Sequence, residues 1–313
     1  MMNNSQKSNR ILKITGIIAT VIILVFSAII TFVPGVNLSW RQIIDTVFVK
    51  STLSLDDQIV FLDVGQSDST LIMSNGEVAL VDLGNLSGGG RNVTEDLKKR
   101  AINDINYIII THYHADHMGV IKTIAENFNI KNVIINKNYS VSDTDAEAIN
   151  DFFDVIEDNN INLEYATDRK QLQVGDFQLT LFVSNLLFQN ENENCTVVSA
   201  NCKSVKTLLM ADAGYDMINN FFVYNYYGED IAHDILKVGH HGSKDSTKLN
   251  FLKLIGPKDA VISCGKNNLY GHPNIEILEM LNEVGANVYR TDLDGDITVK
   301  ITDEDVYEIS SKK

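Results

Sequence analysis

The chain has 313 residues, of which 44% are hydrophobic, and a formal charge of −15 at pH 7. Residues 1–50 hold five of the 26 Lys and Arg but only one of the 41 Asp and Glu, which leaves 21 basic and 40 acidic residues and a charge of −19 beyond them. This surface repels polyanions and anionic lipids unless metal ions or a local basic patch offset it. Three cysteines exclude a disulfide framework, although Cys195 and Cys202 flank a predicted hairpin and one bridge between them stays open.

An apolar segment near the amino terminus predicts a membrane anchor. From Ile14 to Val33 no charged residue occurs, and twenty helical residues span about 30 Å, the thickness of a bilayer core. Lys7, Arg10 and Lys13 precede the segment. The positive-inside rule therefore places residues 1–13 in the cytosol and the carboxyl-terminal domain outside the cell, attached by a single pass. A cleaved signal peptide is the competing interpretation, but its apolar region is usually only about 7–15 residues long.

Residues 34–57 form a predicted tether, and residues 58–313 form the predicted folded domain. In its first half the pattern predicts strands, a hairpin turn at Asn75-Gly76, and helices. The strands are at 59–64, 69–73, 78–82, 105–110 and 132–135, and the helices are near 94–100, 118–128 and 145–157. The second half repeats this order, with strands at 177–183, 196–200, 206–210, 234–238 and 260–264, helices at 215–224, 247–254 and 275–283, and short strands near 288, 297–301 and 306–309. Two similar α/β halves, packed sheet to sheet with helices outside, follow from this order.

The run from Thr111 to His117 is the strongest candidate for a functional site. It places His112, His114, Asp116 and His117 directly after a buried strand and before a helix, at the strand edge where ligands bind in open α/β sheets. His112 and His114 are two residues apart, so an extended backbone points both the same way. Asp116 and His117 lie where the chain turns and can face a second ion. Imidazole and carboxylate together suit zinc, manganese or iron rather than calcium.

Further polar residues follow strands in the second half. Asp212 ends an apolar run and is well placed to bridge two ions, with a helix N-cap as the alternative role. His240 and His241 are adjacent, so on an extended strand one would bind metal and the other would contact substrate. His272 also lies between a strand and a helix, whereas His233 starts a strand and is predicted to be structural.

The HxHxDH run resembles the metallo-β-lactamase superfamily, which implies an αβ/βα four-layer sandwich with one or two metal ions between the sheets. Further motifs resemble the extracellular hydrolase domain of ComEC-type competence proteins, and they are also similar to bacterial phosphorylcholine esterases. These motifs lie at 61–69, 80–84, 208–212, 236–243 and 270–273. Ser67 stands where the competence-type motif usually has Gly, and Asn194 occupies the region of a missing superfamily histidine, which argues against β-lactam hydrolysis. Only one membrane span is predicted, so DNA transport by this chain alone is not expected.

The resemblance implies two divalent ions, Zn²⁺ or Mn²⁺, that share Asp212. His112 and His114 would complete one site, and Asp116 with either His240 or His117 would complete the other. The remaining candidates are predicted to take part in catalysis, to orient the metal ligands or to contact substrate. Asp116, His241 and His272 are the catalytic candidates, and Asp82, Asn194, Ser243 and Asp68 are candidates for orienting ligands or contacting substrate.

The sequence therefore predicts a membrane-anchored, extracytoplasmic metal-dependent hydrolase, a phosphodiesterase or DNase that acts through a metal-bridging hydroxide. Its substrate would be single-stranded DNA or a cell-wall polymer, and no protein partner can be inferred. A teichoic-acid or phosphorylcholine esterase is the alternative, in which tyrosines would wall a choline cation; the candidates are Tyr224, Tyr226, Tyr227 and Tyr270. A non-catalytic anchored binding protein is the alternative from a different class.

Overall fold

The computed structural model describes residues 54–85, 93–139, 146–226 and 228–312, without the side chains of 219–221. The predicted cytoplasmic tail at 1–13, the anchor at 14–33 and most of the tether at 34–57 lie outside these residues. Within the described ranges, none of the helices has the length and apolar character needed to cross a bilayer.

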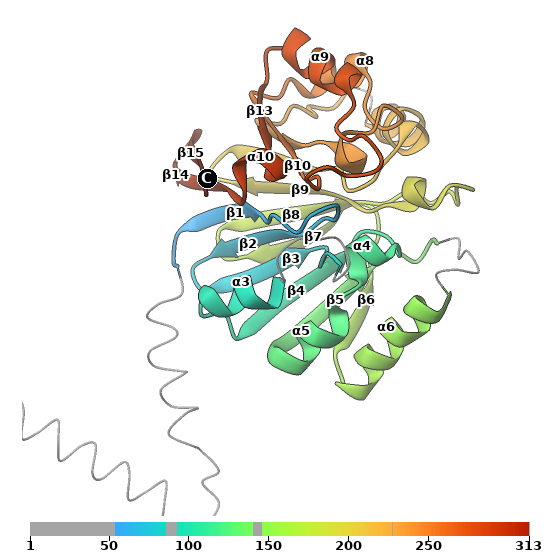
Figure 1. The fold of residues 1–313 in the computed structure, drawn as a ribbon, viewed down its shortest axis with the longest axis vertical. Helices are drawn as coiled ribbons and strands as arrows, with labels where there is room; N and C mark the ends of the chain where they lie inside the picture. Colours follow the sequence, from blue (N-terminus) through green and yellow to red (C-terminus); the bar gives the residue numbers. More distant parts are fainter. Residues whose placement is uncertain (1–53, 86–92, 140–145, 227, 313) are drawn as a thin grey trace, which may run out of the picture. The chain divides into compact units, whose positions relative to one another are not determined.

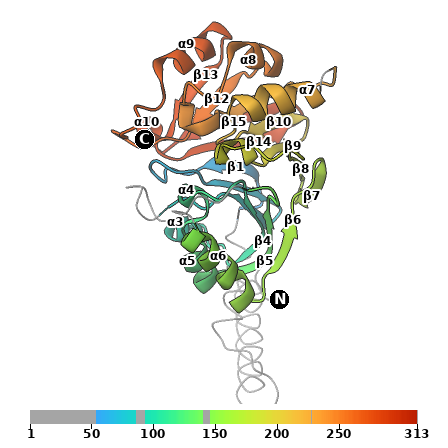
Figure 2. The same ribbon diagram turned by 90° about the vertical axis from the view of Figure 1, so that its right-hand side faces the viewer.

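Two mixed sheets form the centre of the domain (Figures 1 and 2). The eight-stranded sheet has the order β15-β14-β1-β2-β3-β4-β5-β6, and the seven-stranded sheet has the order β13-β12-β11-β10-β9-β8-β7. The strands of the first sheet are β1 (Asp57–Phe61), β2 (Thr70–Ser74), β3 (Glu77–Val81), β4 (Asp104–Ile110), β5 (Asn129–Ile135), β6 (Asn162–Tyr165), β14 (Ile297–Asp303) and β15 (Val306–Ser311). Those of the second are β7 (Lys170–Val174), β8 (Phe177–Phe182), β9 (Val197–Cys202), β10 (Val205–Leu209), β11 (Ile235–Lys237), β12 (Asp259–Ile262) and β13 (Asn287–Arg290).

Helices cover the outer face of each sheet, which gives four layers (Figure 1). The eight-stranded sheet is covered by α3 (Val93–Lys99), α5 (Ile121–Asn127) and α6 (Ala146–Asp158), and the other by α8 (Leu249–Ile255) and α9 (Ile275–Glu283). The shorter elements are α4 (Ala115–Met118), α7 (Val223–Asn225), α10 (Thr291–Asp294), the 3₁₀ segments η2 (Glu191–Asn194) and η4 (Gly239–Gly242), and the π-helix η3 (Asp216–Phe222). The predicted sandwich of two helix-covered halves is therefore confirmed.

Three predictions of local structure need correction. The expected helix at 118–128 is two helices, α4 and α5, separated at Gly119 and Val120. The expected helix at 215–224 is the π-helix η3 followed by one turn, α7. The last two strands do not close the second half, because β14 pairs antiparallel with β1 and extends the first sheet.

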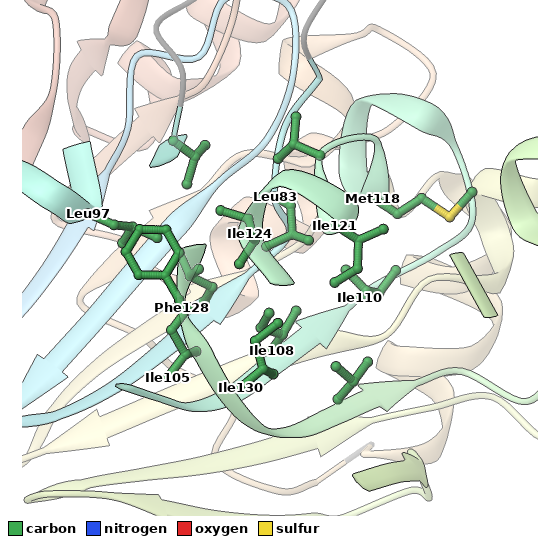
Figure 3. Close-up of a cluster of buried hydrophobic side chains, with 14 of the residues drawn as sticks. Leu83, Leu97, Ile105, Ile108, Ile110, Met118, Ile121, Ile124, Phe128 and Ile130 are labelled. Atoms are coloured by element: carbon green, nitrogen blue, oxygen red, sulfur yellow. The ribbon is translucent and has the colours of Figure 1, made fainter. Parts of the chain in front are cut away.

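Strand β4 shows how the sequence builds the layers that hold the site. Its run Ile108-Ile109-Ile110 is fully buried. Successive side chains of a strand point to opposite faces of the sheet, and both faces are covered here. Ile108 and Ile110 pack against the helices, as Figure 3 shows, whereas Ile109 packs between the two sheets. Each such side chain contributes about 1.5–3 kcal/mol on burial. The strand that precedes the histidine run is therefore held from both sides.

The predicted hairpin turn at Asn75-Gly76 is confirmed. Ser74 of β2 pairs with Glu77 of β3, and the two turn residues have φ of 51° and 79°. Positive φ at both central positions is the requirement of the type I′ turn.

The three cysteines are buried and free. The Cys195 thiol donates to the backbone oxygen of Asn192 at 2.6 Å. The alternative of a Cys195–Cys202 bridge is therefore not realised.

Candidate metal centre

The topology brings the predicted site residues together at one edge of the sandwich. Strands β3 and β4 are parallel neighbours in one sheet, and β10, β11 and β12 are parallel neighbours in the other. The carboxyl ends of parallel strands meet at the same edge. The loops that follow these five strands carry the polar residues, so residues far apart in the chain face one cavity.

Asp82, directly after β3, fixes the loop that follows β4. Its φ is +61°, a left-handed conformation that Asp tolerates better than most residues. One carboxylate oxygen accepts the Thr111 backbone N–H at 2.9 Å, and the other accepts the Thr111 hydroxyl at 2.8 Å and Nδ1–H of His117 at 2.7 Å. The bond from Nδ1 leaves Nε2 of His117 as the ring nitrogen available to a metal.

His112 and His114 form the first pair of donors. Nε2 of His112 and Nδ1 of His114 lie 3.0 Å apart, and one atom from each lies within 4.8 Å of a carboxylate oxygen of Asp212. His114 also lies 2.9 Å from the carboxylate of Glu191, a residue that the sequence analysis does not identify. Glu191 begins the 3₁₀ segment η2, which has no recognisable sequence motif, so only the tertiary structure reveals it.

A left-handed turn presents the second pair of histidines. His240 and His241 have φ of 47° and 53°, and Gly242 follows at 82°. This conformation costs about 1–3 kcal/mol for each non-glycine residue. It lets both adjacent rings approach Asp212, each with Nε2 3.7 Å from a carboxylate oxygen. The expectation for an extended strand, with the two rings on opposite sides, does not apply because the strand has already ended at Lys237.

His241 is held as a donor, whereas His240 lies in the cavity wall. Nδ1 of His241 donates to the Ser263 carbonyl at 2.9 Å, and its Nε2 lies 3.4 Å from Asp116. Nε2 of His240 is instead 3.3 Å from the side-chain nitrogen of Asn192. The second group of potential ligands thus contains Asp116, His117, Asp212 and His241. The sequence left His240 or His117 open as the histidine of this group. The structure includes His117 in the group and adds His241, whereas His240 is not a member.

The donor atoms fit divalent ions. Nε2 of His117, Nε2 of His241 and Oδ1 of Asp212 are buried and have no hydrogen-bond partner. A buried polar atom left without a partner costs about 1–3 kcal/mol, so three in one cluster indicate that a cation completes them. The two groups share Asp212, which fits a pair of ions bridged by one carboxylate. Their imidazole and carboxylate donors suit zinc, manganese or iron.

Charge is distributed unevenly over the cluster. Burial lowers the pKa of His112 well below its usual value, which favours the neutral ring that a metal requires. Burial also opposes the charged form of His117, but Asp82, Asp212 and Asp116 together raise its pKa well above the usual value. His241 follows the same pattern, and its pKa rises to about 9 through Asp212 and Asp68. In the absence of metal, protons on these two rings therefore balance the carboxylates.

Asp68 does not line the cavity, and it contacts the centre through a buried ion pair. Its carboxylate pairs with the ammonium group of Lys237 and lies 3.6 Å from Nδ1 of His241. Both residues of the pair are buried. Lys237 is absent from the predicted site, although a lysine inside the apolar run before His240 is a signal that the sequence does contain.

A cavity of about 510 Å³ opens above the cluster, and its wall includes residues from both sheets. The described residues that line it are Gln66, Asn85, His114, Ala115, Asp116, Asn192, Asp212, His240, His241, Tyr270 and His272. None of the four residues predicted to orient ligands or contact substrate, Asp82, Asn194, Ser243 and Asp68, is part of this lining. The amide of Asn194 is occupied with both backbone polar groups of Phe188, and the Ser243 hydroxyl accepts the Asp245 backbone N–H at 3.3 Å.

Two helix-covered sheets with a shared imidazole and carboxylate cluster at their strand ends define a metallohydrolase-type αβ/βα sandwich. Residues 62–266 match the family model of the metallo-beta-lactamase superfamily, and the chain belongs to that superfamily. Among curated proteins it is similar to ComE operon protein 3 of Bacillus subtilis (strain 168), with 27% identity over 273 residues. It is also similar to Recombination protein 2 of Haemophilus influenzae, with 28% identity over 248 residues, and to Competence protein ComA of Neisseria gonorrhoeae. The domain is thus of the ComEC type.

Each match covers most of this chain but only part of the relative. They include 80% and 77% of this chain but only 34% and 28% of the first two relatives, so the chain spans about a third of their length. Among solved structures, the metallo-beta-lactamase fold protein YhfI of Bacillus subtilis has a TM-score of 0.50 at 14% identity, covering 75% of this chain and 97% of that one. Unliganded yeast PDE1 has a TM-score of 0.51 at 10% identity, covering 79% and 100%. At these identities the likeness establishes the fold alone.

Proposed function

We propose that this protein is a membrane-anchored, extracytoplasmic, metal-dependent phosphodiesterase that cleaves DNA. The observation that carries the proposal is the cluster of buried, unpartnered donor atoms on His117, His241 and Asp212 beside a cavity of about 510 Å³. The apolar segment at 14–33 supports the anchor, and the basic residues before it support an outward-facing domain.

His112, His114 and Asp212 would hold one divalent ion, and Asp116, His117, Asp212 and His241 would hold the other. Two such ions supply an activated water at neutral pH and neutralise charge on the phosphodiester oxygens. Asp82 keeps Nε2 of His117 directed at the cluster.

The contact with the leaving oxygen is assigned to His272, because burial lowers the pKa of this ring and leaves it a neutral hydrogen-bond donor. Both ring nitrogens of His241 are committed, Nδ1 to Ser263 and Nε2 to the donor group. His272 lines the same cavity and belongs to neither group of potential ligands. Its Nδ1 is buried without a hydrogen-bond partner, so this ring can approach substrate without breaking an existing bond.

The names of two relatives, which refer to recombination and to competence, support DNA as the substrate. The charge of −19 beyond residue 50 opposes general DNA affinity, but two divalent ions add four positive charges where the phosphate must bind. A choline ester is less well supported, because Tyr270 is the one tyrosine among the described residues of the cavity lining. The ring of Tyr226 is covered by Arg169 at 4.7 Å, and Tyr227 lies outside the described residues.

The test uses the full chain in mild detergent, loaded with Mn²⁺ or Zn²⁺ and incubated with labelled single-stranded DNA or a choline phosphodiester. Asp212→Asn keeps the side-chain shape and removes the shared carboxylate, so we expect loss of metal and of cleavage. Asp245→Asn is the matched control, because Asp245 is exposed and lies outside the cavity lining. Cleavage of the choline ester without DNA cleavage would favour cell-wall modification. Full metal content without either activity would favour a binding protein.

A further inference from the structure

A row of aromatic rings leads from the surface to the candidate metal centre. Tyr270 is 71% exposed, and its ring stacks on that of His272, with centroids 5.7 Å apart and planes 24° apart. The His272 ring lies 5.7 Å from that of His240 in an edge arrangement, and Nε2 of His240 is 3.7 Å from Asp212. All three rings line the cavity.

The loop that carries Tyr270 is fixed by its own hydrogen bonds. The Asn268 side chain donates to the carbonyls of Gly265 and His272, at 2.9 and 2.6 Å, and accepts the His272 N–H at 2.9 Å. The Gly265 N–H donates to the side chain of Gln66, another residue of the cavity wall, at 2.9 Å. Tyr270 is thus presented on a closed, braced loop, and its ring reaches the binding site without a large loss of conformational entropy.

We propose that Tyr270 stacks on the nucleobase next to the scissile phosphodiester, so that the enzyme selects unpaired nucleic acid. The inference rests on the proposed phosphodiesterase function and adds the element that recognises the substrate. Every base offers a π-face to an aromatic side chain, and such stacking tolerates any sequence. In a duplex the base is already stacked and paired, and exposing it costs a few kcal/mol.

The charges near the loop favour a nucleotide over a choline ligand. Lys266 directly follows Gly265, and Lys244 lies three residues after His241. Both lysines are exposed, and neither forms an ion pair with a carboxylate in the described part of the chain. They would attract the phosphates on either side of the cleaved one and would repel a quaternary ammonium group. One tyrosine also suffices to stack a base, whereas a choline site uses several rings as a cage.

The experiment compares single-stranded oligonucleotides that contain one cleavable phosphodiester and phosphorothioate linkages elsewhere. The nucleosides on both sides of the cleavable bond are either normal or abasic. In the metal-loaded full chain, Tyr270→Ala should lower the ratio of kcat/KM for the normal and the abasic substrate. Stacking of one base contributes about 1–3 kcal/mol, so the ratio should fall by about 5- to 150-fold. Tyr270→Phe keeps the ring and should restore the ratio.

Tyr224→Ala is the matched control, because Tyr224 is 78% exposed but does not line the cavity, and it should keep the wild-type ratio. An equal loss on both substrates in Tyr270→Ala would overturn the proposal, since the ring would then merely support His272. A wild-type preference for the duplex, or for a choline ester, would also overturn it. If the wild type cleaves no phosphodiester, the proposed function fails. The stacking is then judged from fluorescence anisotropy with the normal oligonucleotide, where equal affinity of the wild type and Tyr270→Ala refutes it.

Discussion

Replacing Asp82 by Asn tests the arrangement that directs His117 at the metal centre. Asp82 has a left-handed backbone with φ of +61°, and Asn tolerates this conformation about as well as Asp. Ala would add a backbone cost of about 1–2 kcal/mol there and would confuse the result. Asp82→Asn therefore changes the charge and the acceptor capacity while keeping the backbone and the side-chain shape.

The expected magnitude follows from the bonds that Asp82 accepts. Its two oxygens receive the Thr111 N–H, the Thr111 hydroxyl and Nδ1–H of His117. An amide has one oxygen and places an NH₂ group where the other oxygen stood, so at least one of these donors loses its acceptor. The unpaired buried group should lower the free energy of unfolding by about 1–3 kcal/mol. Loss of the carboxylate behind a metal-bound histidine typically costs 10- to 100-fold in metal affinity, or about 1.4–2.8 kcal/mol.

Metal affinity is measured by competition against a chromophoric chelator, and the fold is checked by circular dichroism and thermal unfolding of the metal-free chain. Asp245→Asn, which removes an exposed carboxylate outside the lining, should leave both unchanged. An Asp82→Asn variant that unfolds cooperatively and binds Zn²⁺ within twofold of the wild type would refute the reasoning.

Three further outcomes are expected. Metal affinity should rise with pH, since the pKa of His241 is raised to about 9 and that of His117 well above its usual value. A protonated ring cannot bind metal, so each of the two rings costs up to about tenfold in affinity per pH unit below its own pKa, and a flat titration from pH 6 to 8 would contradict this. Lys237→Met should leave the Asp68 carboxylate buried without its lysine partner, which should lower the free energy of unfolding by about 3–5 kcal/mol. Thermal unfolding should show that adding Asp68→Asn recovers part of this loss. If Lys244 and Lys266 are the main phosphate contacts, log affinity for single-stranded DNA should fall against log salt with a slope of roughly −1.4, and a slope several times steeper would reveal a basic surface that these two residues do not account for.

Much of the site was predictable because it depends on where strands end. The apolar run of β4 determines the position of His112, and the run of β10 determines that of Asp212. Parallel pairing then brings their carboxyl ends to one edge. Short, half-exposed strands carry a much weaker signal. Strand β6, with the sequence Asn-Leu-Glu-Tyr, has no fully buried residue, and it was not predicted.

The roles of the adjacent histidines could not be read from spacing. Which ring joins the donor group depends on three successive residues with positive φ, from His240 to Gly242. It also depends on the carbonyl of Ser263, which lies on a different strand end and binds Nδ1 of His241. Both are consequences of tertiary packing. The same holds for Glu191 and its contact with His114, since no local pattern marks that glutamate.

The acidic charge of the domain restricts how it would recognise a phosphodiester. A protein with a formal charge of −19 beyond residue 50 cannot hold a polyanion through its general field. Attraction must therefore be local, from ions at the shared Asp212 carboxylate and from the lysines beside the braced loop. Local attraction acts on one or two phosphates, so the rest of the affinity has to come from uncharged contacts. Stacking on Tyr270 is the contact that the cavity wall offers for that purpose, and it makes an unpaired strand a better ligand than a duplex.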